Sequence, residues 1–267
     1  CRPGGPSLWF KHCFFSLEDL EGSGFFPEIV VVSVKTYSLP AVCDELAGSG
    51  LLERNLKAAE FILLMNGMGN REVFDRVGLP ACRVREGVTS LGVTFPEDGM
   101  VELKGAGKTV LEANARQGTR DFFEDMFSKK GFEIEFREDF KEHQWNKLFA
   151  NAVINPITAL TRKKNGIVLS WSLEGTVERI VEECVLVARR EGVEAEREKV
   201  LENLLSVAEK TSANTSSMLQ DVLKGRRTEI ESINGYVVRL AKKHAIRAAV
   251  NEALLALVKA LEGEERA

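Results

Sequence analysis

The chain has 267 residues, of which 44% are hydrophobic and 28% are charged, and its formal net charge at pH 7 is -4. This length and apolar content are sufficient to bury a core in one large domain or in two modest ones. An acidic balance without a long basic stretch argues against a nucleic-acid-binding protein. The longest apolar runs, at 29–34 and 61–65, are far shorter than the roughly 20 residues of a membrane-spanning helix, so we expect a soluble protein with no membrane partner.

The cysteines are five in number, none belongs to a C-x-x-C pair, and they lie at Cys1, Cys13, Cys43, Cys82 and Cys184. An odd number without paired spacing argues against a disulfide framework and a structural zinc site, and it favours the reducing cytoplasm. The chain begins Cys-Arg-Pro-Gly-Gly-Pro and lacks the charged start and apolar core of a signal peptide. We expect that its start is truncated.

The first part of the chain alternates between strand and helix patterns. Residues 28–35, E-I-V-V-V-S-V-K, form a β-branched run that is typical of a strand buried on both faces of a parallel sheet. Ser38 and Pro40 predict the start of a helix, and the Gly-Ser-Gly sequence at 48–50 predicts its end. A second apolar strand at 61–65 runs into Asn-Gly-Met-Gly. This order of elements indicates a doubly wound α/β fold.

Shorter elements follow, and the pattern then changes. Between 84 and 110, alternating runs separated by Pro-Glu-Asp-Gly and Lys-Gly-Ala-Gly predict turns that join antiparallel strands. A helix near 116–129 and a strand near 132–136 come next. From Asp139 onward helical periodicity dominates and strand-like runs disappear. We therefore place a boundary near Glu138, between an α/β domain at 1–138 and an all-helical domain at 139–267.

Two polar residues, Lys35 and Asn66, lie where the predicted strands end. Ligands of open parallel sheets bind beyond the carboxyl ends of the strands, so both residues are candidates for ligand contacts. On local grounds alone, the simpler interpretation is that Lys35 is a solvated strand terminus and Asn66 a turn residue before Gly67. Position does not decide between these interpretations.

The strongest local pattern is W-N-K-L-F-A-N-A-V-I-N-P, in which Lys147, Asn151 and Asn155 recur every four residues and share one helical face. Apolar residues flank this stripe. Burying such polar groups is costly unless they are hydrogen-bonded, so the stripe either faces water or lines a polar pocket. A solvated face that breaks at Asn155-Pro156 and a polar pocket are equally compatible with the local sequence.

Two later segments allow a functional and a structural interpretation. Residues 214–218, Asn-Thr-Ser-Ser-Met, precede a helical run. The exposed backbone N–H groups at such a helix start suit a carboxylate or phosphate. Simple helix capping explains the hydroxyl side chains equally well. Residues 228–231, Thr-Glu-Ile-Glu, fit a capping box, so that Glu229 would only complement a helix dipole. Local sequence favours that second, structural role for Glu229.

Other patterns are weaker. Gly107-Lys108-Thr109 resembles the end of a phosphate-binding loop, but Glu102 occupies the position that the loop's first glycine requires, so we expect a hairpin turn. The histidines, His12, His143 and His244, have neither metal-binding spacing nor a Cys or Ser partner in a catalytic pattern. We expect surface histidines and no metal site.

Several motifs follow one another from about Ile29 to the carboxyl end: V-K-T-Y-S, N-G-M-G, K-L-F-A-N-A-V-I-N-P-I-T-A-L, K-N-G, and S-S-M-L-Q-D-V followed by T-E-I-E-S-I-N-G. Taken together and in this order, they resemble the ketopantoate reductase family. The resemblance implies a Rossmann-type domain followed by an all-helical domain, with the substrate held in the cleft between them. It implies NADPH-dependent reduction of 2-dehydropantoate to pantoate, on the route to pantothenate and coenzyme A. A small-molecule 2-oxoacid is then the expected partner, together with a second copy in a homodimer.

The same resemblance implies roles for individual residues. Lys147 would be the catalytic lysine, which stabilises the developing negative charge on the carbonyl oxygen and donates a proton, a role favoured if burial lowers its pKa. Lys35, Asn66 and Glu229 would contact the dinucleotide, with Glu229 on the nicotinamide-side ribose. The residues that would contact substrate are Asn66, Asn151, Asn155, Asn165, Asn214 and Ser217.

The sequence departs from the family at its beginning. No G-x-G-x-x-G precedes Lys35, and residues 28–35 have the character of a later strand of the sheet, so we expect that the first βα unit is missing. The dinucleotide-binding domain would then be a truncated one. A related reductase of another 2-oxoacid, or a non-catalytic ligand-binding remnant, are the alternatives.

Overall fold

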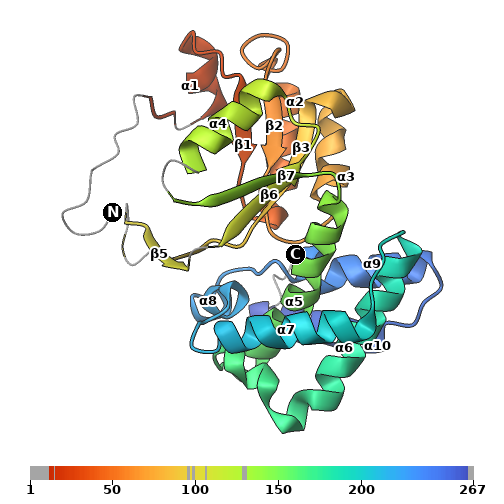
Figure 1. The fold of residues 1–267 in the computed structure, drawn as a ribbon. Helices are drawn as coiled ribbons and strands as arrows, with labels where there is room; N and C mark the ends of the chain where they lie inside the picture. The colour runs from red at the N-terminus through yellow and green to blue at the C-terminus, as the bar shows by residue number, and fades with distance from the viewer. Residues whose placement is uncertain are drawn as a thin grey trace. The chain divides into compact units, whose positions relative to one another are not determined.

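The computed structural model describes residues 12–14, 16–94, 97, 100–105, 107–127 and 131–263. The chain, drawn as a ribbon in Figure 1, divides into two compact units. The first contains Cys1–Met65 and Asn70–Phe140, and the second contains Asn66–Gly69 and Lys141–Ala267. The division therefore falls after Phe140, close to the predicted boundary at Glu138. It also assigns Asn66–Gly69 to the second unit, which the sequence alone does not indicate.

The first unit contains a five-stranded sheet. Its strand order is β1 (Ile29–Val32), β2 (Glu60–Leu63), β3 (Val84–Thr89), β6 (Lys108–Glu112) and β7 (Glu133–Arg137). β1, β2 and β3 are parallel, β6 is antiparallel to β3, and β7 is parallel to β6. Every residue of β2 is buried, as expected of an inner strand covered on both faces. The predicted α/β character is confirmed.

The two N-terminal strands are shorter than predicted. β1 ends at Val32 and β2 ends at Leu63, and these two residues are paired in register. The backbone N–H of Leu64 still donates to the Val32 carbonyl at 2.9 Å, but the chain after Val32 then leaves the ladder and turns into η1 (Thr36–Ser38). Lys35 occupies the N-cap position of this turn, and its backbone carbonyl accepts a hydrogen bond from the Ser38 N–H at 2.9 Å. Lys35 and Asn66 therefore lie in the segments that follow the strands, and not at the strand ends.

Helices connect the strands of the first unit. The predicted helices correspond to α2 (Leu39–Gly48) and α4 (Gln117–Phe127), although 128–130 lie outside the described residues. A further helix, α1 (Leu17–Gly22), was not predicted from the sequence. It is capped by Ser16, whose hydroxyl accepts a hydrogen bond from the Asp19 N–H at 3.1 Å. Three short elements complete this part of the unit: α3 (Asn70–Phe74), η2 (Asp75–Val77) and η3 (Ala81–Arg83).

A separate antiparallel pair is formed by β4 (Gly92–Thr94) and β5 (Glu102–Gly105). Of the predicted Pro-Glu-Asp-Gly turn, only Glu97 belongs to the described residues. Of the predicted Lys-Gly-Ala-Gly turn, Ala106 lies outside the described residues. The expectation of a hairpin turn at Gly107-Lys108-Thr109 is wrong, because β5 pairs with β4 whereas β6 pairs with β3. Gly107 is instead required by close packing, since a Cβ there would lie 2.2 Å from the Ser90 carbonyl oxygen.

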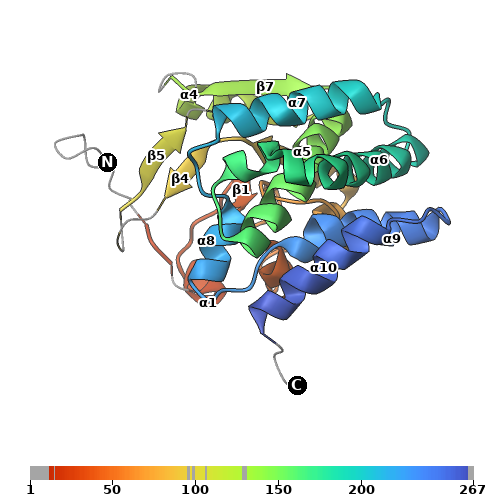
Figure 2. The ribbon, with the colours of Figure 1, turned by 90° about the horizontal axis from the view of Figure 1, so that it is seen from below.

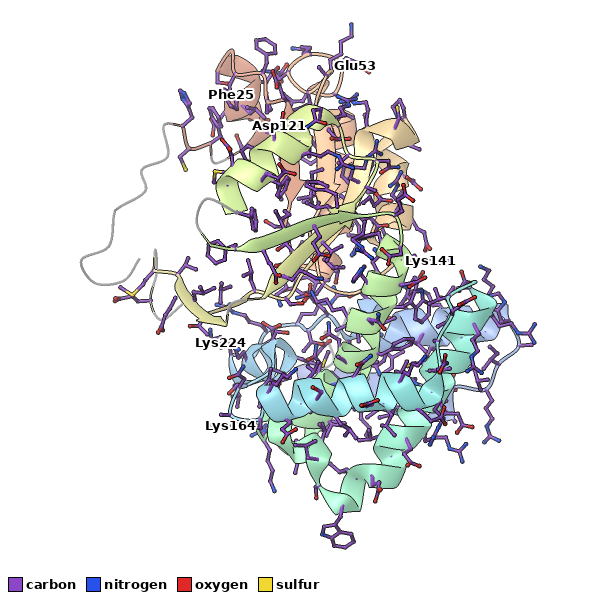
Figure 3. The ribbon with its side chains drawn as sticks, viewed as in Figure 1. Phe25, Glu53, Asp121, Lys141, Lys164 and Lys224 are labelled. Atoms are coloured by element: carbon purple, nitrogen blue, oxygen red, sulfur yellow. The ribbon has the colours of Figure 1, made fainter. Side chains whose placement is uncertain are left out.

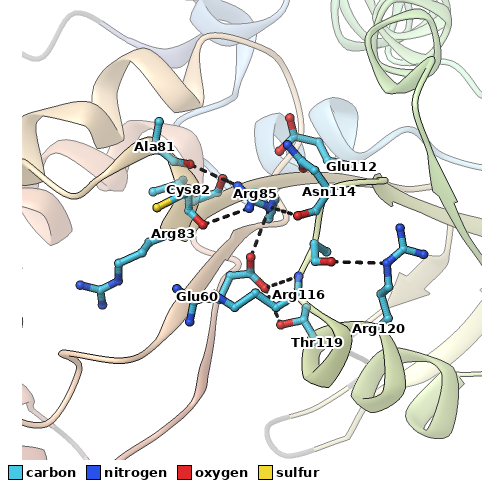
Figure 4. A network of polar contacts seen from close by, with 12 residues as sticks. Glu60, Ala81, Cys82, Arg83, Arg85, Glu112, Asn114, Arg116, Thr119 and Arg120 are labelled. Carbon is cyan, nitrogen blue, oxygen red and sulfur yellow. Dashed lines mark hydrogen bonds and ion pairs between the residues drawn. The ribbon is translucent and has the colours of Figure 1, made fainter.

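A buried ion pair stabilises the beginning of β2 (Figure 4). The Glu60 side chain is fully buried, and its Oε1 lies 3.2 Å from Nε of Arg85. The other carboxylate oxygen accepts hydrogen bonds from the Arg116 N–H and the Thr119 hydroxyl. The Arg85 guanidinium also donates to the backbone carbonyls of Ala81, Cys82, Val84 and Asn114. Direct pairing and these additional hydrogen bonds offset the cost of removing both charges from water.

The second unit is helical, as predicted, and no strand occurs among its described residues. Its elements are α5 (Phe140–Thr161, whose first residue belongs to the first unit), η5 (Asn165–Leu169), η6 (Trp171–Leu173), α6 (Glu174–Arg190), α7 (Arg197–Lys210), α8 (Ser217–Leu223), η7 (Ile230–Ser232), α9 (Asn234–Lys243) and α10 (Ala249–Glu262). Figure 2 shows α5 running among α6, α7, α9 and α10. Together they enclose one apolar core, to which α5 contributes Trp145, Phe149 and Val153.

Several lysines lie on the outside of this helical unit. Lys164, just before η5, and Lys224, just after α8, are both exposed (Figure 3). None of the helices that the structure describes has the length and the apolar character that crossing a membrane requires.

Candidate functional site

The segment Asn66–Gly69 follows β2 and packs on the helical unit. The Met68 N–H donates to the Ser232 carbonyl at 2.8 Å, and the Met68 side chain lies in the helical core. Gly67 has φ +73, and a Cβ at this position would lie 2.4 Å from Oγ of Ser232. Only glycine combines this left-handed backbone with so close an approach. The contact with Ser232 therefore fixes where the Asn66 side chain lies.

Asn66 joins two residues that the sequence separates widely. Its Oδ1 accepts a hydrogen bond from Nζ of Lys147 at 2.6 Å, and its Nδ2 donates to Oε2 of Glu229 at 3.3 Å. Lys147 lies on α5, and Glu229 immediately precedes η7. The amide thus presents its oxygen to a cation and its N–H to an anion, the orientation that both partners favour. Three of the predicted residues form one contiguous group.

Burial changes the acid–base behaviour of this group. Loss of hydration lowers the pKa of Lys147 from 10.5 to about 8, and the nearby negative charge of Glu229 acts in the opposite direction. The two effects follow from the same rule, because burial disfavours the charged ammonium and an opposite charge favours it. Both protonation states of Lys147 are therefore accessible near pH 8, as a group that donates and accepts a proton requires.

The capping-box interpretation of 228–231 is wrong. The Glu229 side chain is only 5% exposed and bonds to Asn66, so it does not serve as a solvated dipole partner. The backbone N–H of Thr228, which a capping box would direct to Glu231, donates instead to Oε1 of Glu262 at 2.8 Å. Glu231 forms ion pairs with Lys259 and Arg239. Glu262, which is distant in sequence, thus accepts the Thr228 N–H in place of the nearby Glu231.

Lys147, Asn151 and Asn155 belong to one uninterrupted helix, because α5 continues through Pro156 to Thr161. The alternative in which the helix breaks at Asn155-Pro156 is therefore excluded. The interpretation as a solvated face also fails at Asn155, which is 7% exposed, while Asn151 is partly buried. Among the described residues, no hydrogen bond to the Asn155 side chain is found. Its amide is thus available to a ligand on the face of α5 that carries Lys147.

The start of α8 is tied to the same helix. The Ser216 hydroxyl caps α8 by accepting from the Leu219 N–H at 3.1 Å, and it lies 2.6 Å from the Thr158 hydroxyl of α5. Ser217 is the first residue of α8 and is exposed. The hydroxyl-rich segment was predicted from the sequence, whereas Thr158 was not. Its signal is the three-residue spacing from Asn155, which places both on one side of α5.

Asn165 and Asn214 meet each other rather than the lysine group. The Asn165 N–H donates to the Asn214 carbonyl at 3.0 Å, and Nδ2 of Asn165 donates to the Thr211 hydroxyl at 3.1 Å. Asn165 is buried and Asn214 is exposed. These contacts hold η5 against the end of α7, which is a structural role for part of the Asn165 amide.

The remaining candidates lie elsewhere. Lys35 belongs to the first unit, in the turn after β1. Of the histidines, His12 is exposed, whereas His143 and His244 are partly buried, and Nε2 of His244 lies 2.5 Å from the Glu191 carboxylate. The expectation of three surface histidines is therefore only partly correct. Among the described residues, no group of three or more His, Cys, Asp or Glu side chains could hold a metal ion.

Two family models match most of this chain. The model described as "Ketopantoate reductase PanE/ApbA" matches residues 23–116, and "Ketopantoate reductase PanE/ApbA C terminal" matches residues 139–262. The 2-dehydropantoate 2-reductase of Pyrococcus horikoshii is 33% identical over 245 residues, which cover 90% of this chain and 77% of that protein. Sequence similarity therefore extends over both units.

Solved structures show the same fold. The PanE/ApbA family ketopantoate reductase of Ralstonia eutropha JMP134 has a TM-score of 0.79 and 25% identity, over 91% of this chain and 78% of that one. D-mandelate dehydrogenase in a ternary structure with NADH and anilino(oxo)acetate has a TM-score of 0.78 and 23% identity, over 88% of this chain and 76% of that one. This second likeness is one of fold alone.

Proposed function

Because this chain belongs to the ketopantoate reductase family of oxidoreductases, we propose that it serves the NADPH-dependent reduction of 2-dehydropantoate to pantoate, a step toward pantothenate and coenzyme A. The observation that carries the proposal is the hydrogen-bonded group of Lys147, Asn66 and Glu229. It unites a cation of lowered pKa, a neutral amide and a buried carboxylate. The two units would serve as the dinucleotide-binding domain and the substrate-binding, catalytic domain.

Part of a nicotinamide dinucleotide site fits the residues present. A buried carboxylate, as at Glu229, suits ribose hydroxyls, which need acceptors, and the Asn66 amide suits polar groups of the nicotinamide end. Lys35 and Asn66 follow neighbouring parallel strands of a Rossmann-type sheet, at whose carboxyl edge dinucleotides bind. When bound, NADPH supplies the hydride. No G-x-G-x-x-G turn for the pyrophosphate precedes Lys35 in this sequence.

The chain's own residues would control the proton and the charge. Protonated Lys147 would stabilise the negative charge that grows on the C2 carbonyl oxygen and then donate its proton to that oxygen. A pKa of about 8 makes this donation easier than it would be for a hydrated lysine. Asn66 would hold the ammonium in place through the 2.6 Å hydrogen bond. Glu229 would keep enough of the lysine protonated near neutral pH.

The substrate would be oriented by neutral groups. Asn151 and Asn155 extend from the face of α5 that carries Lys147, so their amides could bind carboxylate and hydroxyl oxygens without adding a charge that must be desolvated. Ser217, next to the tethered Ser216, would add a hydroxyl. We include Asn165 and Asn214 by family resemblance, although their contacts with each other and with Thr211 also support a structural role.

Substrate identity distinguishes the main alternative. A reductase of another 2-oxoacid would use the same lysine and asparagines, since preference among side chains depends on pocket shape. The fold neighbour that binds anilino(oxo)acetate together with NADH makes both the substrate and the choice of NADPH over NADH questions for experiment. A non-catalytic ligand-binding protein is the second alternative.

A direct assay tests the proposal. The purified chain is incubated with ketopantoate and either NADPH or NADH. A second version, extended at its amino end by the strand, glycine-rich turn and helix of a Rossmann-type first βα unit, is assayed in the same way. We expect the enzyme to oxidise NADPH, and to do so more efficiently with ketopantoate than with other 2-oxoacids. If an extended form that binds NADPH reduced another 2-oxoacid at least about a hundredfold more efficiently, the substrate assignment would be wrong.

Location and assembly complete the proposal. We propose a cytoplasmic protein that forms a homodimer, in keeping with the absence of paired cysteine spacing and with the family. Light scattering on the purified protein would give the oligomeric state. A monomer at micromolar concentration would contradict the second part of this proposal.

A further inference from the structure

Pro156 creates a defect in the helix that carries the candidate site. In an α-helix the N–H of residue 156 would donate to the carbonyl of Ala152, but proline has no N–H and its ring crowds that carbonyl. Both Ala152 and Pro156 are buried, so water is not a ready substitute. A buried carbonyl without a donor is costly. The Ala152 carbonyl therefore needs a donor from outside α5.

Asn234 is that donor. Nδ2 of Asn234 lies 2.9 Å from the Ala152 carbonyl oxygen, in a fully buried position at the start of α9. The same nitrogen donates to Oδ1 of Asn251 at 3.0 Å, and Nδ2 of Asn251 donates to Oε2 of Glu183 at 2.8 Å. Two acceptors face the same Asn234 atom, which determines which end of the amide carries the nitrogen.

Glu183 fixes the far end of this chain of hydrogen bonds. Its carboxylate accepts from the Val250 and Asn251 N–H groups at 3.0 Å each, at the beginning of α10. The hydrogen bond to Ala152 is thus held by α6, α9 and α10 together. A side chain anchored on three helices loses little further freedom when it donates to a fourth.

The position of the Ala152 carbonyl gives this contact a consequence for the site. Ala152 lies between Asn151 and Asn155, one helical turn beyond Lys147. A kink at this point would change the direction of Asn155 relative to the lysine, since unsatisfied carbonyls and inserted water are recognised causes of helix bending.

We propose that Asn234 is a positioning residue, whose amide replaces the hydrogen bond that Pro156 denies to Ala152 and so keeps Asn155 on the face of α5 that holds Lys147. The hydrogen bond from Asn234 to Ala152 of α5 is inferred from geometry alone. Its effect on catalysis rests on the proposed function.

The test is a double-mutant cycle of Asn234→Ala and Pro156→Ala. Asn234→Ala should raise the unfolding equilibrium constant about ten- to a hundredfold, as expected when a buried hydrogen-bond partner is removed. Pro156→Ala restores the missing N–H, so the effect of Asn234→Ala should fall by about tenfold in that background. Asn251→Ala is the matched control. It damages the same buried network without removing the donor to Ala152, so Pro156→Ala should not relieve its effect.

Two further readouts separate positioning from general destabilisation. Amide hydrogen exchange should show faster exchange at 153–159 in Asn234→Ala and recovery in the double variant. For folded enzyme, the KM for ketopantoate should rise about tenfold in Asn234→Ala with little change in kcat, and it should recover in the double variant.

The outcomes distinguish this inference from the proposed function. Equal effects of Asn234→Ala in both backgrounds, or unchanged exchange in α5, would overturn the inference whether or not the enzyme reduces ketopantoate. If stability and exchange recover but no form of the protein reduces ketopantoate, the substrate assignment fails and the role of Asn234 in α5 is supported.

Discussion

Each unit withdraws a cation from water in its own way, with Arg85 buried and Lys147 half-buried. In the first unit, Arg85 lies 3.2 Å from the Glu60 carboxylate, and its other N–H groups donate to backbone carbonyls. In the second unit, Lys147 donates to the neutral amide of Asn66, which in turn donates to the Glu229 carboxylate. A directly paired guanidinium stabilises the fold, whereas an ammonium that meets an amide keeps a pKa of about 8. The difference shows how a buried charge can serve either structure or chemistry.

The largest expected effect comes from Lys147→Met. Removing a general acid typically lowers turnover by about 10²- to 10⁴-fold, and we expect a loss in this range for ketopantoate reduction. Stability should change in the opposite direction. The lowered pKa means that the folded protein disfavours the ammonium, so the variant should gain up to about 3 kcal/mol of unfolding free energy at pH 7. Turnover assays and urea unfolding measure the two effects.

The pH dependence of stability provides a check on this variant. Between about pH 8 and 10.5, the unfolded wild-type chain binds more protons at Lys147 than the folded chain does, so this residue's contribution to stability should rise with pH. Lys147→Met should lack this rise. Full turnover in Lys147→Met would contradict the catalytic assignment.

The same substitution at the structural cation should have the opposite effect. Arg85→Met leaves the Glu60 carboxylate buried without its counter-ion and removes the donors to several backbone carbonyls. We expect a loss of about 3–5 kcal/mol in unfolding free energy, measured by urea denaturation.

A second substitution tests the reason for this loss. Glu60→Gln in the Arg85→Met background removes the uncompensated charge while keeping a side chain of similar size, so it should recover part of the stability. If Arg85→Met alone were neutral, the contrast between the two buried cations would be incorrect.

A smaller effect is expected from Glu229→Gln. The negative charge of Glu229 raises the pKa of Lys147, so its removal should lower that pKa further. If protonated Lys147 is the active form, turnover declines as pH rises through this pKa, and the decline should occur at lower pH in the variant. The control is Glu231→Gln, since Glu231 is paired with Lys259 and Arg239. An equal displacement of both pH profiles would argue against a specific role for Glu229.

The sequence was sufficient for the features that depend on local periodicity. The α/β pattern, the helical second half and the shared face of Lys147, Asn151 and Asn155 all follow from spacing, and α5 confirms that face. The sequence left a helix break at Pro156 open as an alternative, because a local rule cannot include Asn234, which supplies a donor to Ala152 from another helix.

Features that depend on distant contacts were not predictable in the same way. Asn66 meets Lys147 across 81 residues and Glu229 across 163 residues, and the approach depends on Gly67 packing against Ser232. Thr228 binds Glu262 instead of forming the local capping box. In each case the sequence offered several possible hydrogen-bond donors or acceptors, and tertiary packing determined which of them became partners.

The most direct test of the proposed role of Lys147 in proton transfer is to measure its pKa. Lysine labelled with ¹³C at Cε can be titrated by NMR in the intact protein, with the Lys147→Met spectrum identifying the resonance. We predict a midpoint of about 8. A midpoint near the ordinary lysine value of 10.5 would show that Lys147 remains hydrated, and it would contradict the claim that the buried group prepares this lysine for proton transfer.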